Sequence, residues 1–181
     1  MPLRVLSSFN KSGGTLITKE DNSLESALIS GITCSNDDSK IILRNVPDTP
    51  GIAAKILSPI SEAGIDVDVI VQNVGSDKST DFTFTVKNDL SEKAAKIIKD
   101  LTEGFGGGEV ELVKDVSKVS VVGVGMKSHA GVAAQMFGAL ANKKINIDMI
   151  STSEIKISVV VAKDKAEKAV IALHDEFELD K

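Results

Sequence analysis

The chain has 181 residues, of which 42% are hydrophobic and 26% are charged, and it carries a net charge of −5. This composition is typical of a globular protein, and a mildly acidic chain without a basic cluster is not expected to bind nucleic acid. No apolar run approaches the roughly 20 residues that a membrane-spanning helix needs. Cys34 is the only cysteine, which excludes an intrachain disulfide and a thiolate metal site. We therefore expect a cytoplasmic protein with no membrane or nucleic-acid partner.

Residues 1–26 are polar, and we expect a short strand near residues 4–9 followed by a loop. Residues 11–15, Lys-Ser-Gly-Gly-Thr, have the composition of a phosphate-binding loop. Such a loop needs an apolar strand before it and a helix after it, and neither is predicted here. Nucleotide binding is therefore not expected in this part of the chain.

An internal duplication organises the rest of the chain. Residues 45–54, Asn-Val-Pro-Asp-Thr-Pro-Gly-Ile-Ala-Ala, recur in altered form at residues 125–134. Gly131 lies 80 positions after Gly51, and the same offset relates the helix and the strand that follow each turn. An ungapped match over strand, turn, helix and strand indicates two copies of one module. Function is then expected where the two turns can meet.

The first copy is predicted to run from residue 40 to residue 115 as a βαββαβ unit. In the turn after its first strand, Thr49 is expected to cap a helix and Pro50 to occupy the first helical position. Gly64 is expected to end this helix in a left-handed conformation. The predicted elements are strands at 40–46, 66–73, 81–87 and 109–113 and helices at 50–63 and 90–102. This order matches the ferredoxin-like arrangement.

The second copy repeats the pattern but lacks its fourth strand. Its predicted elements are strands at 119–125, 147–152 and 155–161 and helices at 131–142 and 164–177. An open sheet edge has to be paired or covered, and the predicted strand at 27–34 is the only candidate to pair with it. We therefore predict an α+β fold of two ferredoxin-like βαββαβ modules. Each has an antiparallel sheet with helices on one face, and the first module is inserted in the second.

Catalytic candidates are weak in this sequence. The two histidines, His129 and His174, have no partner at the spacing of a metal site, so we expect neither catalysis nor metal binding from them.

A binding function has more support, because each turn presents the free amides of a helix start, which suit a carboxylate. If the strand starting at Asp66 lies beside the first turn, Asp48 and Asp68 could hold an ammonium group, with Gln72 nearby. That arrangement suits a free amino acid. The alternative is that the turns are only well-capped helix starts.

Residues 46–54 together with 66–74 closely resemble the first ACT domain of aspartate kinase. Residues 123–132 together with 146–158 resemble the second, and residues 3–9 and 14–17 resemble the end of the family's kinase domain. The resemblance implies a division of the chain into three parts. These are a remnant of the kinase domain or linker at 1–26, a first ACT module at 40–115, and a second ACT module formed by 27–39 plus 116–181.

The resemblance further implies that the chain is the regulatory β subunit or the C-terminal regulatory region of aspartate kinase. That enzyme phosphorylates L-aspartate with ATP. No catalytic site and no cofactor are expected in this chain, since ATP and Mg would belong to a catalytic α subunit or a kinase domain. Implied partners are that kinase, a second copy in a homodimer, and L-threonine, possibly with L-lysine, as feedback inhibitor. Two alternatives stay open: an ACT scaffold that binds no ligand and only mediates assembly, and a catalytically active transferase.

The family's effector sites lie where the first module of one chain meets the second module of another. Asp66 departs from the family, which often has Asn there, as this chain does at Asn146; the extra carboxylate would favour a cationic ligand and keeps lysine open. Ala133 stands where some members have threonine. The implied site comprises Asp48, Thr49, Pro50, Gly51, Ile52, Ala53, Asp66, Val67, Asp68 and Gln72 of one chain, with Val132, Ala133, Asn146 and Ile147 opposite.

Overall fold

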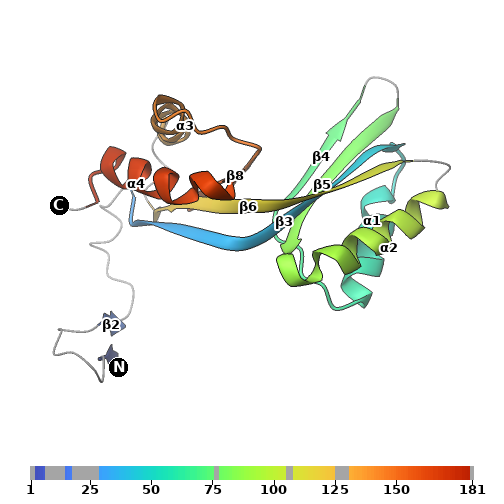
Figure 1. The fold of residues 1–181 in the computed structure, drawn as a ribbon, viewed down its shortest axis with the longest axis horizontal. Helices are drawn as coiled ribbons and strands as arrows, with labels where there is room; N and C mark the ends of the chain where they lie inside the picture. Colours follow the sequence, from blue (N-terminus) through green and yellow to red (C-terminus); the bar gives the residue numbers. More distant parts are fainter. Residues whose placement is uncertain are drawn as a thin grey trace.

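Two long strands run through both modules and join them into one antiparallel sheet (Figure 1). The computed structural model describes residues 3–6, the backbone of residues 15–17, and residues 29–75, 78–104, 108–124 and 131–179. The sheet has the strand order β4-β5-β3-β6-β8-β7. Its strands are β3 (Gly31–Pro47), β4 (Ile70–Val74), β5 (Ser79–Lys87), β6 (Glu109–Val122), β7 (Met149–Thr152) and β8 (Lys156–Ala162).

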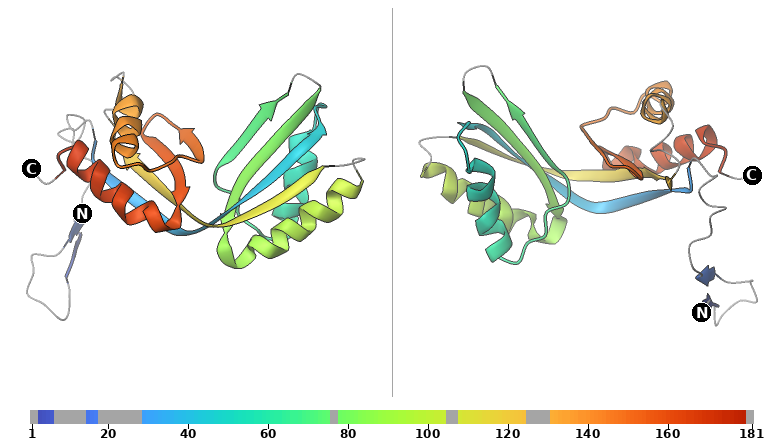
Figure 2. Two further views of the ribbon diagram at one scale, coloured as in Figure 1. Left: turned by 45° about the horizontal axis from the view of Figure 1, so that its top comes forward. Right: turned by 180° about the vertical axis from the view of Figure 1, so that it is seen from behind.

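The first module is built on the second half of β3, which pairs with β5 on one side and with the first half of β6 on the other. Helices α1 (Ile52–Glu62) and α2 (Ser91–Glu103) cover one face of this sheet (Figure 2). Alternate residues of β3 and β5, such as Leu43 and Phe84, point into a core with the apolar faces of these helices. The alternating apolar residues of the strands and the apolar faces of the helices thus pack into one core.

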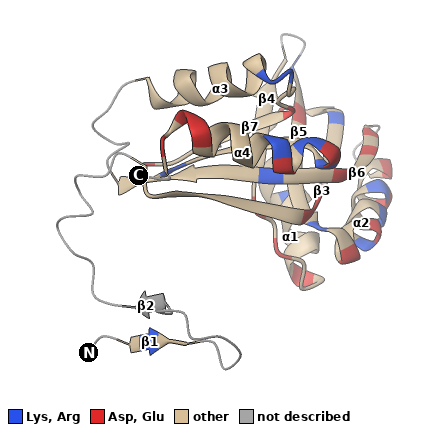
Figure 3. Cartoon of the chain, turned by 60° about the vertical axis from the view of Figure 1, so that its left-hand side comes forward, with Lys and Arg blue, Asp and Glu red and all other residues tan. Residues whose placement is uncertain are grey.

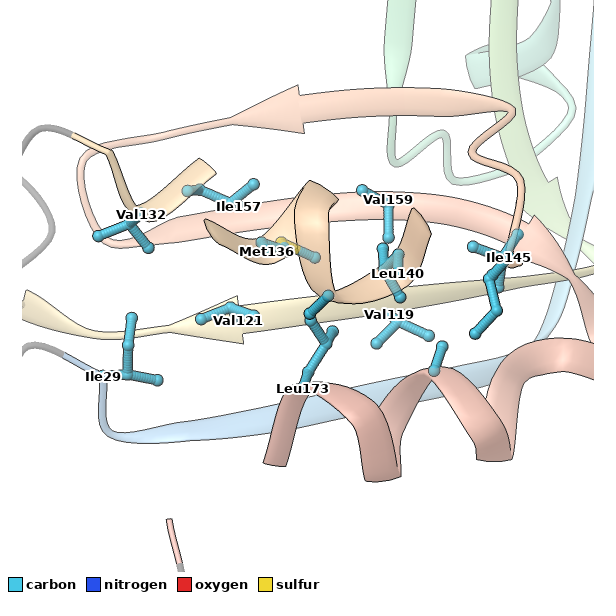
Figure 4. Packing of buried hydrophobic residues seen from close by; sticks show 13 residues of the cluster. Ile29, Val119, Val121, Val132, Met136, Leu140, Ile145, Ile157, Val159 and Leu173 are labelled. Carbon is cyan, nitrogen blue, oxygen red and sulfur yellow. The ribbon is translucent and has the colours of Figure 1, made fainter. Parts of the chain in front are cut away.

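The second module uses the first half of β3 as the strand that its own copy lacks. Gly31 pairs with Val122 and Ser35 with Lys118, so β3 lies beside the second half of β6. Helices α3 (Val132–Asn142) and α4 (Ala166–Glu176) cover this sheet, and the resulting core is shown in Figure 4. The predicted insertion of the first module in the second is therefore confirmed.

Continuity of the strands is the main difference from the prediction. Four separate strands, at 27–34, 40–46, 109–113 and 119–125, are in fact two continuous ones, β3 and β6. The pairing shifts register on both sides of Asp38, where the ribbon passes from one module to the other. Strand pairing supports β3 on both sides of these shifts, so the strand continues from one module into the other.

An apolar cluster lies at the junction of the two modules. It contains Val69, Val116, Met149 and Val160, and it is separate from the two module cores. Two ion pairs accompany it: Lys40 contacts Asp148, and Lys118 contacts Asp68. In each pair the lysine belongs to one module and the aspartate to the other.

Smaller elements complete the described chain. Strands β1 (Leu3–Val5) and β2 (Thr15–Ile17) form a separate antiparallel pair. Residues 7–9 of the strand predicted near residues 4–9 lie outside the described residues. Short 3₁₀ turns, η2 (Asn88–Leu90) and η4 (Lys163–Lys165), lead into α2 and α4. Acidic and basic residues intermingle over α2 (Figure 3). Among the described residues, no helix is both long and apolar enough to cross a membrane.

Candidate functional site

A cavity of about 400 Å³ lies at the turn between β3 and α1. Gln72, in the middle of β4, also lines it. Seven residues line it, and all seven belong to the site implied by the sequence: Asp48, Thr49, Pro50, Gly51, Ile52, Ala53 and Gln72.

The helix start at this cavity differs from the predicted one. Helix α1 begins at Ile52, two residues later than expected, and its N-cap is Gly51 with a left-handed φ of 91°. The backbone closes the turn, since the N–H of Thr49 bonds to the carbonyl of Pro47 (3.0 Å) and that of Ile52 to the carbonyl of Thr49 (3.1 Å). The predictions of a Thr49 cap and of Pro50 as the first helical residue are therefore wrong. With residues 48–51 used for the turn, the helix can start only beyond them.

No side chain caps the described start of α1. The amides of a first helical turn have no partner within the helix, and together with the helix dipole they suit an anionic group. The exposed carboxylate of Asp48 and the exposed amide of Gln72 lie on the same cavity. The cavity thus offers donors for a carboxylate, an acceptor for an ammonium group, and a neutral group that can donate and accept hydrogen bonds.

Asp66, Val67 and Asp68 do not lie at this cavity. The N–H of Asp48 bonds to the carbonyl of Lys78 (2.9 Å), whereas that of Asp68 bonds to the carbonyl of Thr85 (3.1 Å). Lys78 and Thr85 are seven residues apart along one extended segment, which corresponds to roughly 20 Å at ~3.3 Å per residue.

The prediction that Asp48 and Asp68 hold one ammonium group is therefore wrong within a single chain. The physical reason is the βαβ connection: α1 carries the chain back to the level of Lys40, in the middle of β3, before β4 starts. The turn of one module and the start of its next strand consequently lie at opposite ends.

The two aspartates at equivalent places in the duplication are instead found at the module junction. Asp68 pairs with Lys118, and the Oδ2 atom of Asp148 lies 3.3 Å from the Nζ atom of Lys40. The side-chain amide of Asn146 donates to Oδ1 of Asp148 over 3.2 Å. Ile147 and Asp148 line a second cavity of about 350 Å³ between the modules, together with Lys40 and residues of β3, β4 and β5.

The second turn repeats the helix start of the first. Gly131 has a left-handed φ of 103°, α3 begins at Val132, and no described side chain caps it. Val132 is buried, and Ala133 is half-buried against the core of the second module. Residues 125–130, which include His129, lie outside the described residues. In this module too, Asn146 and Ile147 lie at the end opposite to the helix start, because the same βαβ connection separates them.

Lys40 and Lys118 were not singled out from the sequence, although a signal for them exists. Each lysine directly precedes a buried residue of the first strand of its module, Ile41 and Val119. The two lysines are 78 positions apart, so an alignment of the first strands shows their repeat only when it is shifted by two positions from the offset of 80. Among the described residues, no group of three or more His, Cys, Asp or Glu side chains is placed to hold a metal ion.

Comparison with known protein families identifies the same kind of domain in both modules. Models described as ACT domain match residues 41–103 and 119–177. The aspartate kinase of Pseudomonas fluorescens (strain SBW25) is 55% identical over 181 residues, which is 99% of this chain but 44% of that protein. The chain thus spans less than half the length of the curated relatives that it matches.

Two solved structures match this chain over nearly their whole length. The ligand-free regulatory subunit of aspartate kinase from Thermus thermophilus is 41% identical, with a TM-score of 0.78. The match covers 83% of this chain and 99% of that one. A crystal structure of aspartokinase alpha and beta subunits gives the same four values.

Proposed function

Because the chain belongs to the family of aspartate kinase regulatory subunits and carries two ACT domains, we propose that it binds free amino acids and thereby controls a catalytic aspartate kinase. The observation that carries this proposal is the cavity at the start of α1. Its Asp48 carboxylate, uncapped helix amides and Gln72 amide complement the ammonium and carboxylate groups of an amino acid. We propose L-threonine as the ligand of this cavity.

The described chain supplies only part of the implied site, and its sheet edges suggest how a second copy would complete it. β4 and β7 are the outer strands of the six-stranded sheet. They carry exposed apolar side chains at equivalent positions, Ile70 (46% exposed) and Ile150 (44%). Open edges with apolar side chains favour pairing with another chain, and a symmetric dimer would join β4 of one chain to β7 of its partner.

Antiparallel joining of these edges would divide the implied site into two. The second half of β4, from Gln72 onward, would meet the start of the partner's β7, so the cavity at Asp48 would gain Asn146 and Ile147 from the second chain. The start of helix α3, with Val132 and Ala133, would meet the segment of residues 66–68 from the second chain. Each dimer edge would then hold two related sites in place of a single large one.

The two sites would carry their carboxylate on different elements. One has Asp48 on the turn and the neutral Asn146 opposite, whereas the other has Ser128 at the place of Asp48 and Asp66 at the place of Asn146. The carboxylate of the second site thus lies on the facing segment, where it could attract a second ammonium group, and we propose this site for L-lysine. Threonine and lysine would then act at different places on the same dimer.

Control of the kinase would follow from ligand-dependent packing. An amino acid bound between two chains stabilises the arrangement that closes the site and leaves other arrangements unaffected. A coupling free energy of about 1–3 kcal/mol would change the activity of a partner kinase by about 5–150-fold.

Titration calorimetry with L-threonine, L-lysine and L-methionine, singly and combined, tests the proposal; the chain has no Trp or Tyr, which makes intrinsic fluorescence a poor probe. We expect Gln72→Ala to weaken threonine binding by roughly tenfold or more, as for the loss of a hydrogen bond to a charged group. Asp68→Asn is the matched control and should leave threonine affinity unchanged. Unchanged affinity in Gln72→Ala would contradict the assignment of the cavity as the threonine site. If none of the three amino acids binds, the remaining role for the chain is subunit assembly.

A further inference from the structure

We propose that Lys40 is a positioning residue for ligand binding, which acts through Asp148 on Asn146. The inference rests on the proposed function, since Asn146 is one wall of the proposed threonine site. It adds a residue that lies outside the implied site and belongs to the other module of the same chain.

One carboxylate connects the two residues. The Nζ atom of Lys40 lies 3.3 Å from Oδ2 of Asp148, and the side chains are only 11% and 30% exposed. The other oxygen of Asp148, Oδ1, accepts a hydrogen bond from the side-chain amide of Asn146 at 3.2 Å. The amide nitrogen of Asn146 is thereby committed to Asp148. Its carbonyl oxygen remains available to accept a hydrogen bond from an ammonium group.

Lys40 holds this arrangement in place. Without its charge, the carboxylate of Asp148 would lose the partner that orients Oδ2, and Oδ1 would no longer present a fixed acceptor to Asn146. Asn146 itself is exposed, so its amide would then exchange between orientations, some of which turn the nitrogen toward the ligand. An amide nitrogen facing an ammonium group repels it.

The location of Lys40 gives the contact a second consequence. Lys40 lies on β3, eight residues before Asp48 of the turn cavity in the same chain. In the proposed dimer, Asn146 serves the cavity of the partner. The ion pair therefore connects a wall of one ligand site to the strand that leads into the other.

The duplication supplies a matched control. Lys118 on β6 pairs with Asp68 as Lys40 pairs with Asp148. Beside Asp68, however, Asp66 stands in place of Asn146, and an ionised carboxylate has no hydrogen to donate. Breaking the Lys118 pair thus removes an equivalent contact of the junction without touching an oriented amide.

The variants should fold, because the apolar cluster of Val69, Val116, Met149 and Val160 holds the junction together beside both ion pairs. Methionine keeps much of the apolar stem of lysine while it removes the charge. We expect Lys40→Met and Lys118→Met to lower the thermal midpoint by similar small amounts.

The experiment combines NMR of the ligand-free protein with calorimetry. In Lys40→Met, the side-chain amide resonances of Asn146 should shift, and L-threonine should bind about three- to tenfold more weakly, as for a partly screened ion pair that orients a hydrogen bond. Lys118→Met should leave the Asn146 resonances and threonine affinity unchanged. Lys40→Arg, which keeps the charge, should restore both.

Each result decides the question. Unchanged Asn146 resonances in Lys40→Met overturn the inference whether or not an amino acid binds, and so does an equal loss of affinity in both methionine variants. If the resonances respond as expected but the wild-type chain binds neither L-threonine nor L-lysine, the proposed function fails. The contact of Lys40 with Asp148 would then only orient Asn146, and its role in ligand binding would be overturned with the function.

Discussion

Gln72 and Asp68 are separated by only four positions, yet they lie at different ends of the first module. Gln72 lines the turn cavity, whereas Asp68 contacts Lys118 at the junction. In an extended segment four residues cover roughly 13 Å, which is more than the length of a threonine molecule. Residues that are neighbours in a motif therefore need not share a ligand.

Cys34 offers a test of the local electrostatics at the residue scale. Its thiol donates to Oδ1 of Asn36 over 3.3 Å. Partial burial, and then the negative charge of Asp38, raise the pKa of the Cys34 thiol above its ordinary value. A raised pKa lowers the thiolate fraction near neutral pH, and the thiolate is the reactive form.

We therefore expect Cys34 to react with iodoacetamide more slowly in the folded chain than in the unfolded chain at the same pH. Asp38→Asn removes the neighbouring negative charge, lowers the pKa of the thiol and should speed the reaction. Asp37→Asn is the matched control, since Asp37 is not a cause of the shift. Mass spectrometry of the alkylated protein gives the rates, and equal rates for the two variants would contradict the role of Asp38.

At the scale of elements, the two helix starts depend on a left-handed glycine. Gly51 and Gly131 have φ values of 91° and 103°, which residues with a Cβ atom rarely adopt. Gly138 lies inside α3 with an ordinary φ, and a Cβ atom there would meet open space. The same substitution should therefore have opposite effects at the two kinds of position.

Gly51→Ala should lower the free energy of unfolding by about 1–2 kcal/mol, because alanine resists the left-handed conformation. Gly138→Ala should raise it by about 0.5–1 kcal/mol, because alanine loses less backbone freedom in a helix. Urea denaturation followed by circular dichroism measures both. A loss of stability in Gly138→Ala would show that α3 contacts another surface at this position.

The edge strands are elements that the proposed dimer requires. Ile150 on β7 is 44% exposed, and Ile171 on α4 is 55% exposed but lies away from the sheet edges. A lysine on an edge strand opposes pairing with another strand, because its charge would have to be desolvated in the interface. Ile150→Lys should therefore convert the dimer into a monomer.

Ile171→Lys introduces the same charge on a helix and should leave the dimer intact. Size-exclusion chromatography with light scattering distinguishes the two outcomes. A dimer that survives Ile150→Lys would place the interface elsewhere on the molecule.

The whole molecule should unfold as one unit, although it contains two modules. β3 and β6 each contribute to both sheets, so neither module can lose its strands without disturbing the other. Leu43 in the first core and Leu173 in the second are both fully buried. Their replacement by alanine should cost about 2–5 kcal/mol each.

Scanning calorimetry of Leu43→Ala and of Leu173→Ala should show a single transition at a lower midpoint in both variants. The calorimetric and van't Hoff enthalpies should agree if the transition is two-state. Two separate peaks, of which only one moves in each variant, would show that the modules unfold independently.

The parts of this structure that could be predicted are those with a local signal. The offset that relates Gly51 to Gly131 identified two modules, and the strands that carry Leu43 and Phe84 were predicted at 40–46 and 81–87. The missing fourth strand of the second copy was enough to predict the insertion. Such signals depend on backbone periodicity and on glycine, which act over a few residues.

The separation of Asp66, Val67 and Asp68 from the turn cavity and the contacts at the junction depended on how the chain folds in space. Lys40 and Asp148 are 108 positions apart, and Lys118 and Asp68 are 50 apart. They meet because β3 and β6 are continuous and because α1 returns the chain to the level of Lys40, in the middle of β3. No local pattern encodes either property, since both follow from strand pairing and its register across the two modules.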